Sequence, residues 1–210
     1  MRSRRTILSF IVAAFGLAAP GAHAGASAVP SPTNSTVDPC VRVCPAGDMN
    51  FHVVVRDLNS SPIAGSTVVV DFTSCPGIML CPLIGSEPYL LGPGSIVRMV
   101  TNAAGIADFP IRAGGTCAGP AKVFADGVIL ASSLPVPSPD QNGDAVVNAA
   151  DQAILAVKLG GAYDPTADIN CNTTMGADDS AELDRHLGHS CGAVVPVSPR
   201  SWGRIKIFYR

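Results

Sequence analysis

A short acidic segment in the C-terminal half of the chain gives the clearest indication of the fold. Residues 140–151 read DQNGDAVVNAAD. Oxygen donors recur along this segment at positions 1, 3, 5, 7, 9 and 12: Asp140, Asn142, Asp144, the carbonyl of Val146, Asn148 and Asp151. Ca²⁺ is a hard cation that takes about six to eight oxygen ligands, and a loop of this spacing wraps one ion. The segment is therefore predicted to be a calcium loop.

A second copy of the pattern begins 28 residues later, where residues 168–179 read DINCNTTMGADD. In the same frame the donors are Asp168, Asn170, Asn172, the carbonyl of Thr174, and Asp179. Helical patterns at 152–160 and 180–188 follow the two loops, and each ends in Gly. An internal repeat of this kind indicates one structural unit used twice. We expect two Ca²⁺ sites, the second weaker because it offers fewer carboxylates.

Position 6 of such loops is normally Gly, because the chain turns sharply there. Here position 6 is Ala145 in the first loop and Thr173 in the second. A β-branched residue is strained at positive φ, so distortion is expected in the second loop. The proline-rich residues 135–139 forbid a helix before the first loop.

Loop and helix, used twice without an entering helix, resemble a type I dockerin over residues 138–191. The resemblance implies an EF-hand-related module that binds Ca²⁺ in both loops and docks through its helices into a cohesin domain. It also implies a place in a polysaccharide-degrading assembly. The family's recognition positions, 10 and 11 of each loop, often carry hydroxyls. Here they are Ala149, Ala150, Ala177 and Asp178, which departs from that pattern.

The preceding residues break into short β-rich runs separated by turn residues. The runs span 50–56, 66–72, 95–101, 106–112, 121–125 and 128–131. Asp126-Gly127 between the last two predicts a tight hairpin. Several short strands in about 100 residues favour an immunoglobulin-like β-sandwich over residues 38–134. The fold class is thus mostly β with a small α module.

Within the sandwich, the turns around 62–65 and 101–105 resemble bacterial immunoglobulin-like domains of the invasin and intimin type. The resemblance implies a spacer, an adhesion stalk or an accessory module.

The chain ends are expected to serve export and to remain outside the two domains. Residues 1–24, with an Arg-rich start, an apolar run and Ala22-His-Ala24, are typical of a secretory signal peptide, the alternative being an uncleaved anchor. Ser3-Arg-Arg also hints at twin-arginine export. Residues 25–37 are expected to be a flexible segment and 135–139 a linker. No further stretch is long and apolar enough to span a membrane.

The formal net charge of −2 conceals an uneven distribution. Residues 140–192 carry −7, whereas the tail 193–210 carries +4. A globally basic nucleic-acid-binding protein is excluded. Four interpretations of the tail remain open: a frayed end, an edge strand, a sorting or anchoring signal, or a segment that docks on the acidic module.

Seven cysteines indicate an oxidising compartment or a metal–thiolate site. Cys171 and Cys191 bracket the second loop and are expected to pair. Among the other five, Cys75 with Cys81 is favoured, with Cys117 bonded to Cys40 or Cys44. One thiol of these five then stays unpaired. The Cys40-x-x-x-Cys44 spacing is a poor zinc motif.

Catalysis is not expected, because nucleophile elbows, phosphate loops and dinucleotide motifs are absent from the sequence. His52, His186 and His189 are isolated from any recognisable catalytic motif. We therefore expect a secreted or cell-surface, non-catalytic protein that attaches to a protein partner through the calcium module. One alternative is an adhesion or matrix-spacer protein with structural calcium sites. The weakest is a carbohydrate-processing accessory protein, since sugar platforms usually need more aromatic residues than this chain has.

Overall fold

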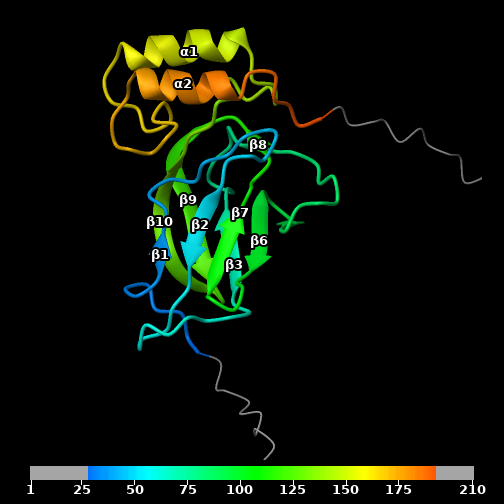
Figure 1. Cartoon of the computed structure of the whole chain (residues 1–210), viewed down its shortest axis with the longest axis vertical. Helices are drawn as coiled ribbons and strands as arrows, with labels where there is room; N and C mark the ends of the chain where they lie inside the picture. The colour runs from blue at the N-terminus through cyan, green and yellow to red at the C-terminus, as the bar shows by residue number, and fades with distance from the viewer. Residues whose placement is uncertain (1–27, 193–210) are drawn as a thin grey trace, which may run out of the picture.

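The computed structural model describes residues 28–192, which form a mostly β protein with a small helical part (Figure 1). The predicted signal peptide and basic tail lie outside these residues. The elements, in chain order, are β1 (Thr36–Val37), β2 (Phe51–Val54), β3 (Thr67–Asp71), β4 (Met79–Leu80), β5 (Leu90–Gly92), β6 (Ile96–Val100), β7 (Ile106–Phe109), β8 (Ala113–Gly114), β9 (Cys117–Ala125), β10 (Val128–Val136), α1 (Ala149–Leu159) and α2 (Ala177–Arg185).

Two antiparallel sheets share one apolar core. The smaller has the order β1-β2-β7 and the larger the order β10-β9-β3-β6-β5, while β4 and β8 form a separate pair. Alternate residues of each strand face inward, as the period of a strand requires. Phe51 and Val53 of β2 therefore meet Val68 and Val70 of β3 in the core, and all four are fully buried.

The expected hairpin is present. β9 and β10 pair through Asp126 and Gly127, which both have positive φ, at 46° and 83°. Two positive φ angles suit the twist of a two-residue hairpin. The first four predicted runs each contain an observed strand, and the last two are parts of the longer β9 and β10. β10 continues to Val136, into the range expected to be linker.

The predicted linker, 135–139, and the described part of the predicted flexible segment 25–37 both make hydrogen bonds with the rest of the protein. Residues 136–139 are buried, and the Val43 N–H donates to the Pro137 carbonyl at 3.3 Å. Ser31 is also buried, and its N–H donates to the Arg56 carbonyl at 2.7 Å. Backbone hydrogen bonds therefore attach residues of the segment predicted to be flexible, 25–37, to the sheet.

The two helices lie side by side across one end of the sheets (Figure 1). Their apolar faces meet in a second core, in which Leu155 and Leu183 pack with Ile169. Cys44 and Met49, from the chain before β2, belong to the same cluster. The helical module and the sandwich thus share apolar contacts. Neither helix of residues 28–192 has the length and apolarity needed to cross a membrane.

The disulfide bonds differ from every predicted pairing. They join Cys40 to Cys171, Cys75 to Cys117 and Cys81 to Cys191. The prediction assumed that the helical module is closed by its own cysteines, whereas two of the three bonds join it to the sandwich. The unpaired thiol is Cys44, one of the five cysteines of the first domain, as expected.

Candidate functional site

The two predicted calcium loops have the same backbone shape. Positions 4 and 6 are left-handed in both: Gly143 and Ala145 have φ of 75° and 67°, and Cys171 and Thr173 have 62° and 69°. Three of these four residues carry a Cβ, which disfavours this conformation. The loops adopt it nonetheless, so the sharp turn expected at position 6 is present without glycine.

In the first loop the carboxylates at positions 1 and 12 hold the backbone. Asp140 accepts from the N–H groups of Gly143 and Ala145, each at 2.8 Å. Asp151 accepts from the N–H groups of Gln141 and Asn148, also at 2.8 Å. The second of these contacts is half of a capping box, in which Asn148 in turn caps α1. Asp151 thus holds the loop backbone and, together with Asn148, also caps the N-terminus of α1.

The second loop repeats three of these four contacts 28 residues later, and in the fourth the donor is at position 5 instead of position 4. Asp168 accepts from the N–H groups of Asn172 and Thr173, at 3.0 and 2.8 Å. Asp179 accepts from those of Ile169 and Gly176, at 2.8 and 2.9 Å. Gly176 has no side chain with which to cap α2, so this loop lacks the equivalent of Asn148. Tyr163 adds a contact that the first loop does not have, donating its hydroxyl to Asp168 at 2.9 Å.

The remaining predicted donors lie along the rim of each loop. Asn142 and Asp144 accept through their side chains from backbone N–H groups two residues ahead, as Asn170 and Asn172 do in the second loop. The carbonyl of Val146 accepts from the Asn148 side chain at 3.2 Å. Thr174 occupies the corresponding exposed rim of the second loop. The structure therefore gathers the predicted donors into two compact loops.

Four carboxylates in these loops are buried: Asp140, Asp151, Asp168 and Asp179. Burial raises the pKa of Asp140, and the charges of Asp151 and Asp144 add to the effect, while backbone N–H groups oppose it. Burial raises the pKa of Asp179 as well. None of the ion pairs among the described residues involves these four side chains. A cation would relieve the cost of keeping such groups ionised.

Asp178, at position 11 of the second loop, was predicted only as a recognition residue of the docking surface, but its side chain also contacts the loop. Its carboxylate accepts from the side-chain amides of Asn170 and Asn172, each at 2.6 Å. The amide of Asn170 is the main cause of a lowered pKa of Asp178. The second loop thereby gains a third carboxylate. Position 11 of the first loop is Ala150, so the repeat gave no signal for this role.

A shallow groove of about 210 Å³ runs between the two helices. Its lining includes two pairs of residues that are equivalent in the repeat, Gln152 with Ser180 and Leu155 with Leu183. Asp184 completes the groove and accepts from the Gln152 side chain at 2.7 Å. The groove therefore lies where the two units of the repeat meet.

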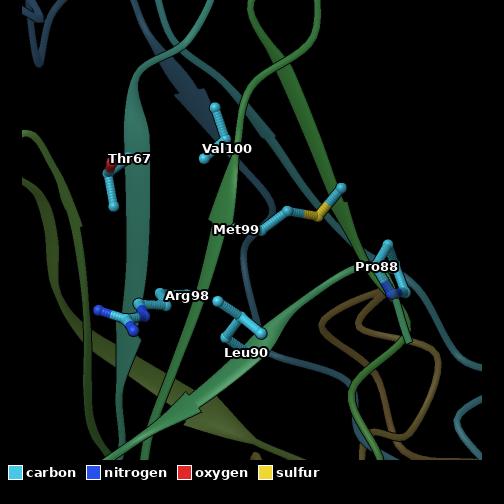
Figure 2. A pocket seen from close by; sticks show the side chains of 6 residues that line it. All are labelled: Thr67, Pro88, Leu90, Arg98, Met99 and Val100. Carbon is cyan, nitrogen blue, oxygen red and sulfur yellow. The ribbon is translucent and has the colours of Figure 1, made fainter. Parts of the chain in front are cut away.

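A larger hollow of about 340 Å³ lies on the sandwich, beside β5 and β6 (Figure 2). Its lining is mainly apolar, and Arg98 is the one charged side chain among the residues that form it: Thr67, Pro88, Leu90, Arg98, Met99 and Val100. These six residues include no pair of acid and base and no nucleophile with its base, so they suggest no reaction.

One group of potential metal ligands was missed by the sequence analysis. Cys44, Asp48, His186 and His189 converge at the junction of the sandwich and α2, with one potential ligand atom of each lying within 4.8 Å of the others. Cys44 was considered as a disulfide partner and, with Cys40, as a poor zinc motif, and the histidines are more than a hundred residues away from it. The pairs Cys44-x-x-x-Asp48 and His186-x-x-His189 were the only signal available in the sequence.

Comparisons of the chain with protein-family models, with curated proteins and with solved structures find no match.

Proposed function

We propose that this chain is a secreted, non-catalytic attachment protein, in which a dockerin-like module of residues 138–191 is stabilised by Ca²⁺ and joined to an immunoglobulin-like sandwich. The observation that carries the proposal is that the two loops share their left-handed positions and three of the four backbone contacts made by the carboxylates at positions 1 and 12. Each loop has left-handed residues at positions 4 and 6 and buried carboxylates at positions 1 and 12. Two antiparallel sheets around one core support the immunoglobulin-like assignment. Three disulfide bonds support secretion.

The donor chemistry of the loops fits Ca²⁺. All the donors are carboxylate, amide or carbonyl oxygens, which a hard cation prefers. Asp140, Asn142, Asp144 and Asp151 would hold the ion in the first loop, and Asp168, Asn170, Asn172 and Asp179 in the second. Bound Ca²⁺ would supply positive charge beside the buried carboxylates and so stabilise the folded loops.

The surface proposed for docking is the outer side of α1 and α2. The family's recognition positions are exposed at the start of each helix, as Ala149 and Ala150 in the first and as Ala177 and Asp178 in the second. Val157 on α1 is also exposed, to 78%. Alanine, which occupies three of these four positions, suits a partner that approaches the helices closely. We propose a cohesin-like protein as that partner.

Calorimetric titration of the full chain with Ca²⁺, after treatment with a chelator, tests the metal sites. We expect binding heat and a higher midpoint of thermal unfolding. Asp140→Ala should weaken the first site more than Asn172→Ala weakens the second, because Asp140 is a buried carboxylate whereas Asn172 is a neutral, exposed side chain. Absence of binding heat would refute the calcium assignment, and the reverse ranking would refute the order of the sites.

A pull-down of secreted proteins, followed by a binding measurement with each purified candidate, tests the partner. We expect capture by the wild-type chain in Ca²⁺ and loss of capture in a chelator. Ala150→Arg places a long charged side chain on the proposed surface and should abolish capture without affecting Ca²⁺ binding. Equal capture by this variant and the wild type would contradict docking through the helices.

A rigid spacer with structural calcium sites is the second candidate function, and the disulfide bonds favour it. Cys40–Cys171 and Cys81–Cys191 fix the module against the sandwich. Arg112, on the sandwich side, adds a hydrogen bond of 2.6 Å to the Cys191 carbonyl. A spacer needs such stiffness, whereas a docking module does not. Ca²⁺ binding without any calcium-dependent partner would favour this candidate.

A further inference from the structure

The cluster of Cys44, Asp48, His186 and His189 joins two parts of the chain that are distant in sequence. Cys44 and Asp48 belong to a tight turn, closed by a hydrogen bond of 2.9 Å from the Gly47 N–H to the Cys44 carbonyl. His186 caps the C-terminal end of α2, and His189 lies one turn further on. The sandwich thus supplies two of the side chains and the helical module the other two.

The distances among Cys44, His186 and His189 are those of a tetrahedral zinc site. Zinc bonds of about 2.0–2.1 Å to nitrogen and about 2.3 Å to sulfur place two nitrogens about 3.3–3.4 Å apart and nitrogen and sulfur about 3.6 Å apart. The Nδ1 atoms of His186 and His189 are 3.3 Å apart, and they lie 3.7 and 3.6 Å from the Cys44 Sγ. The Asp48 Oδ2 lies 3.0 and 3.3 Å from the same two nitrogens.

A catalytic triad does not account for this arrangement. In a triad the acid and the nucleophile contact opposite nitrogens of the histidine ring. Here the Asp48 carboxylate and the Cys44 thiol both approach the Nδ1 atom of His186, as does the second histidine. One ring nitrogen can donate or accept a single proton. Convergence of three polar atoms on it is instead the pattern that a shared cation produces. Cys44 is also fully buried, and so is closed to a substrate.

The surroundings of the cluster resemble the supporting shell of a structural metal site. The other ring nitrogen of His186, Nε2, faces the Glu182 carboxylate at 3.6 Å, one turn earlier on α2. A carboxylate behind a histidine ligand fixes the orientation of its ring. Cys44 and His186 are buried, whereas the side chains of Asp48 and His189 are 44% and 31% exposed. An ion could therefore enter from the rim.

We propose that Cys44, Asp48, His186 and His189 bind one Zn²⁺ ion that locks the helical module to the sandwich. Sulfur and imidazole ligands favour zinc over calcium, so this site is independent of the two oxygen-rich loops. Four protein ligands close a tetrahedral site, which makes it structural rather than catalytic. On binding, the thiol releases its proton to the solvent and the sulfur coordinates as the thiolate, with no change in oxidation state.

Titration of the full, metal-free chain with Zn²⁺, in excess Ca²⁺ so that the oxygen-rich loops are occupied, tests the proposal. We expect one Zn²⁺ per chain and a higher midpoint of thermal unfolding. Titration with Co²⁺ in place of Zn²⁺ should give the visible bands of a tetrahedral ion and a thiolate-to-cobalt charge-transfer band. That band reports on sulfur directly, because Cys44 is the only free cysteine of residues 28–192.

His189→Gln is the decisive variant, because this side chain lies at the rim and its loss spares the core. It should weaken Zn²⁺ binding by more than about 10-fold. Substitution of a residue that only supports a metal ligand typically weakens binding by at least about this factor, and His189 is proposed to be a ligand itself. Cys44→Ser should remove the charge-transfer band. His52→Gln is the matched control, since His52 is a half-exposed histidine on the sandwich that contacts Asp108 instead.

Three outcomes would overturn the proposal. The first is the absence of stoichiometric Zn²⁺ binding. The second is binding of equal strength in wild type, His189→Gln and His52→Gln, which would indicate scattered surface ligands. The third is a tetrahedral Co²⁺ spectrum without a thiolate band.

Discussion

At the scale of single residues, Asp178 changes what is expected of the second loop. The sequence offers that loop fewer carboxylates than the first, and Gly176 leaves position 9 without a side chain. The structure places the Asp178 carboxylate against Asn170 and Asn172, two of the predicted ligands. A charge at that point compensates for the missing one at position 5. The two loops should therefore differ less in calcium affinity than ligand counting suggests.

Asp178→Asn should weaken Ca²⁺ binding at the second loop by about 10-fold or less and leave the first loop unchanged, because ligand charge sets the affinity of such sites. Calorimetric titration of the full chain measures both sites. Asp184→Asn is the matched control, since it removes the same charge from the exposed side of the same helix. If both variants bind Ca²⁺ alike, Asp178 has no role in the loop.

Much of the candidate calcium site follows from residue spacing alone, because a loop that wraps an ion must place its donors at fixed intervals. The sharp turn at position 6 was expected for the same reason, whereas the distortion expected at Thr173 is not seen in its φ, which is close to that of Ala145. Asp178 and the cluster around Cys44 could not be found in this way. The contact of Asp178 depends on the orientation of its side chain. The cluster around Cys44 depends on which segments, distant in sequence, lie together in the fold.

At the scale of elements, the first loop and β8 are packed too closely for any side chain at Gly114. A Cβ on Gly114 would lie 2.0 Å from the Asp140 Oδ2. That oxygen is itself fixed, since it accepts from the Ala145 N–H. The glycine of this short strand therefore determines where position 1 of the loop lies.

Gly114→Ala should destabilise the protein by roughly 1–3 kcal/mol, the usual cost of overpacking, and should weaken Ca²⁺ binding at the first loop. Thermal unfolding and calorimetry measure the two effects. Gly160→Ala is the control: at the end of α1 a Cβ meets nothing nearer than 3.6 Å, so a change within about 0.5 kcal/mol is expected. Equal stability of the two variants would contradict the prediction, because it would show that the first loop moves to accommodate the added Cβ at little energetic cost.

Element prediction succeeded where a run is long enough to show a period. The strands and helices with clear alternation or helical spacing were all expected within a few residues. β1, β4, β5 and β8 were not, because strands of two or three residues carry no period. Such short strands form because a neighbouring strand supplies backbone hydrogen bonds. Which strand lies beside them depends on the fold and cannot be seen in the local sequence.

At the scale of the whole molecule, Arg112 connects three segments. Its guanidinium donates to the Glu87 carboxylate at 3.2 Å, to the Pro82 carbonyl at 2.9 Å and to the Cys191 carbonyl at 2.6 Å. Burial alone would raise the pKa of Glu87, but the backbone N–H groups of Ile84, Gly85 and Glu87 and the Arg112 guanidinium outweigh it and lower this pKa to about 2. The folded state therefore favours the ionised carboxylate.

The stabilisation from Glu87 should be complete above its unfolded pKa of about 4.5 and should disappear as the pH falls towards 2, because a lowered folded pKa means that unfolding takes up a proton in this range. Urea unfolding of wild type and Glu87→Gln at several pH values measures it. The difference in unfolding free energy should be largest near neutral pH and shrink below pH 4.5. A difference that does not vary with pH would contradict the assigned cause.

The disulfide connectivity was the largest failure of prediction, and its cause is physical. The sequence separations of Cys40–Cys171 and Cys81–Cys191 are 131 and 110. Pairing over such distances depends on how the sandwich and the helical module meet, which no local pattern encodes. The sequence analysis assumed two independent domains and therefore predicted disulfide bonds only within each domain.

The Cys40–Cys171 bond has a mechanical consequence for a protein proposed to tether others. If residues 28 and 192 were pulled apart, the shortest covalent route between them would run from Cys40 across the disulfide to Cys171 and on through α2. Every strand except β1, together with the first loop and α1, belongs to the bypassed part of the chain. Tension would fall on residues 28–40, which include β1, and on the part of the chain from Cys171 through α2, so even complete yielding there would lengthen the molecule only by these two short segments.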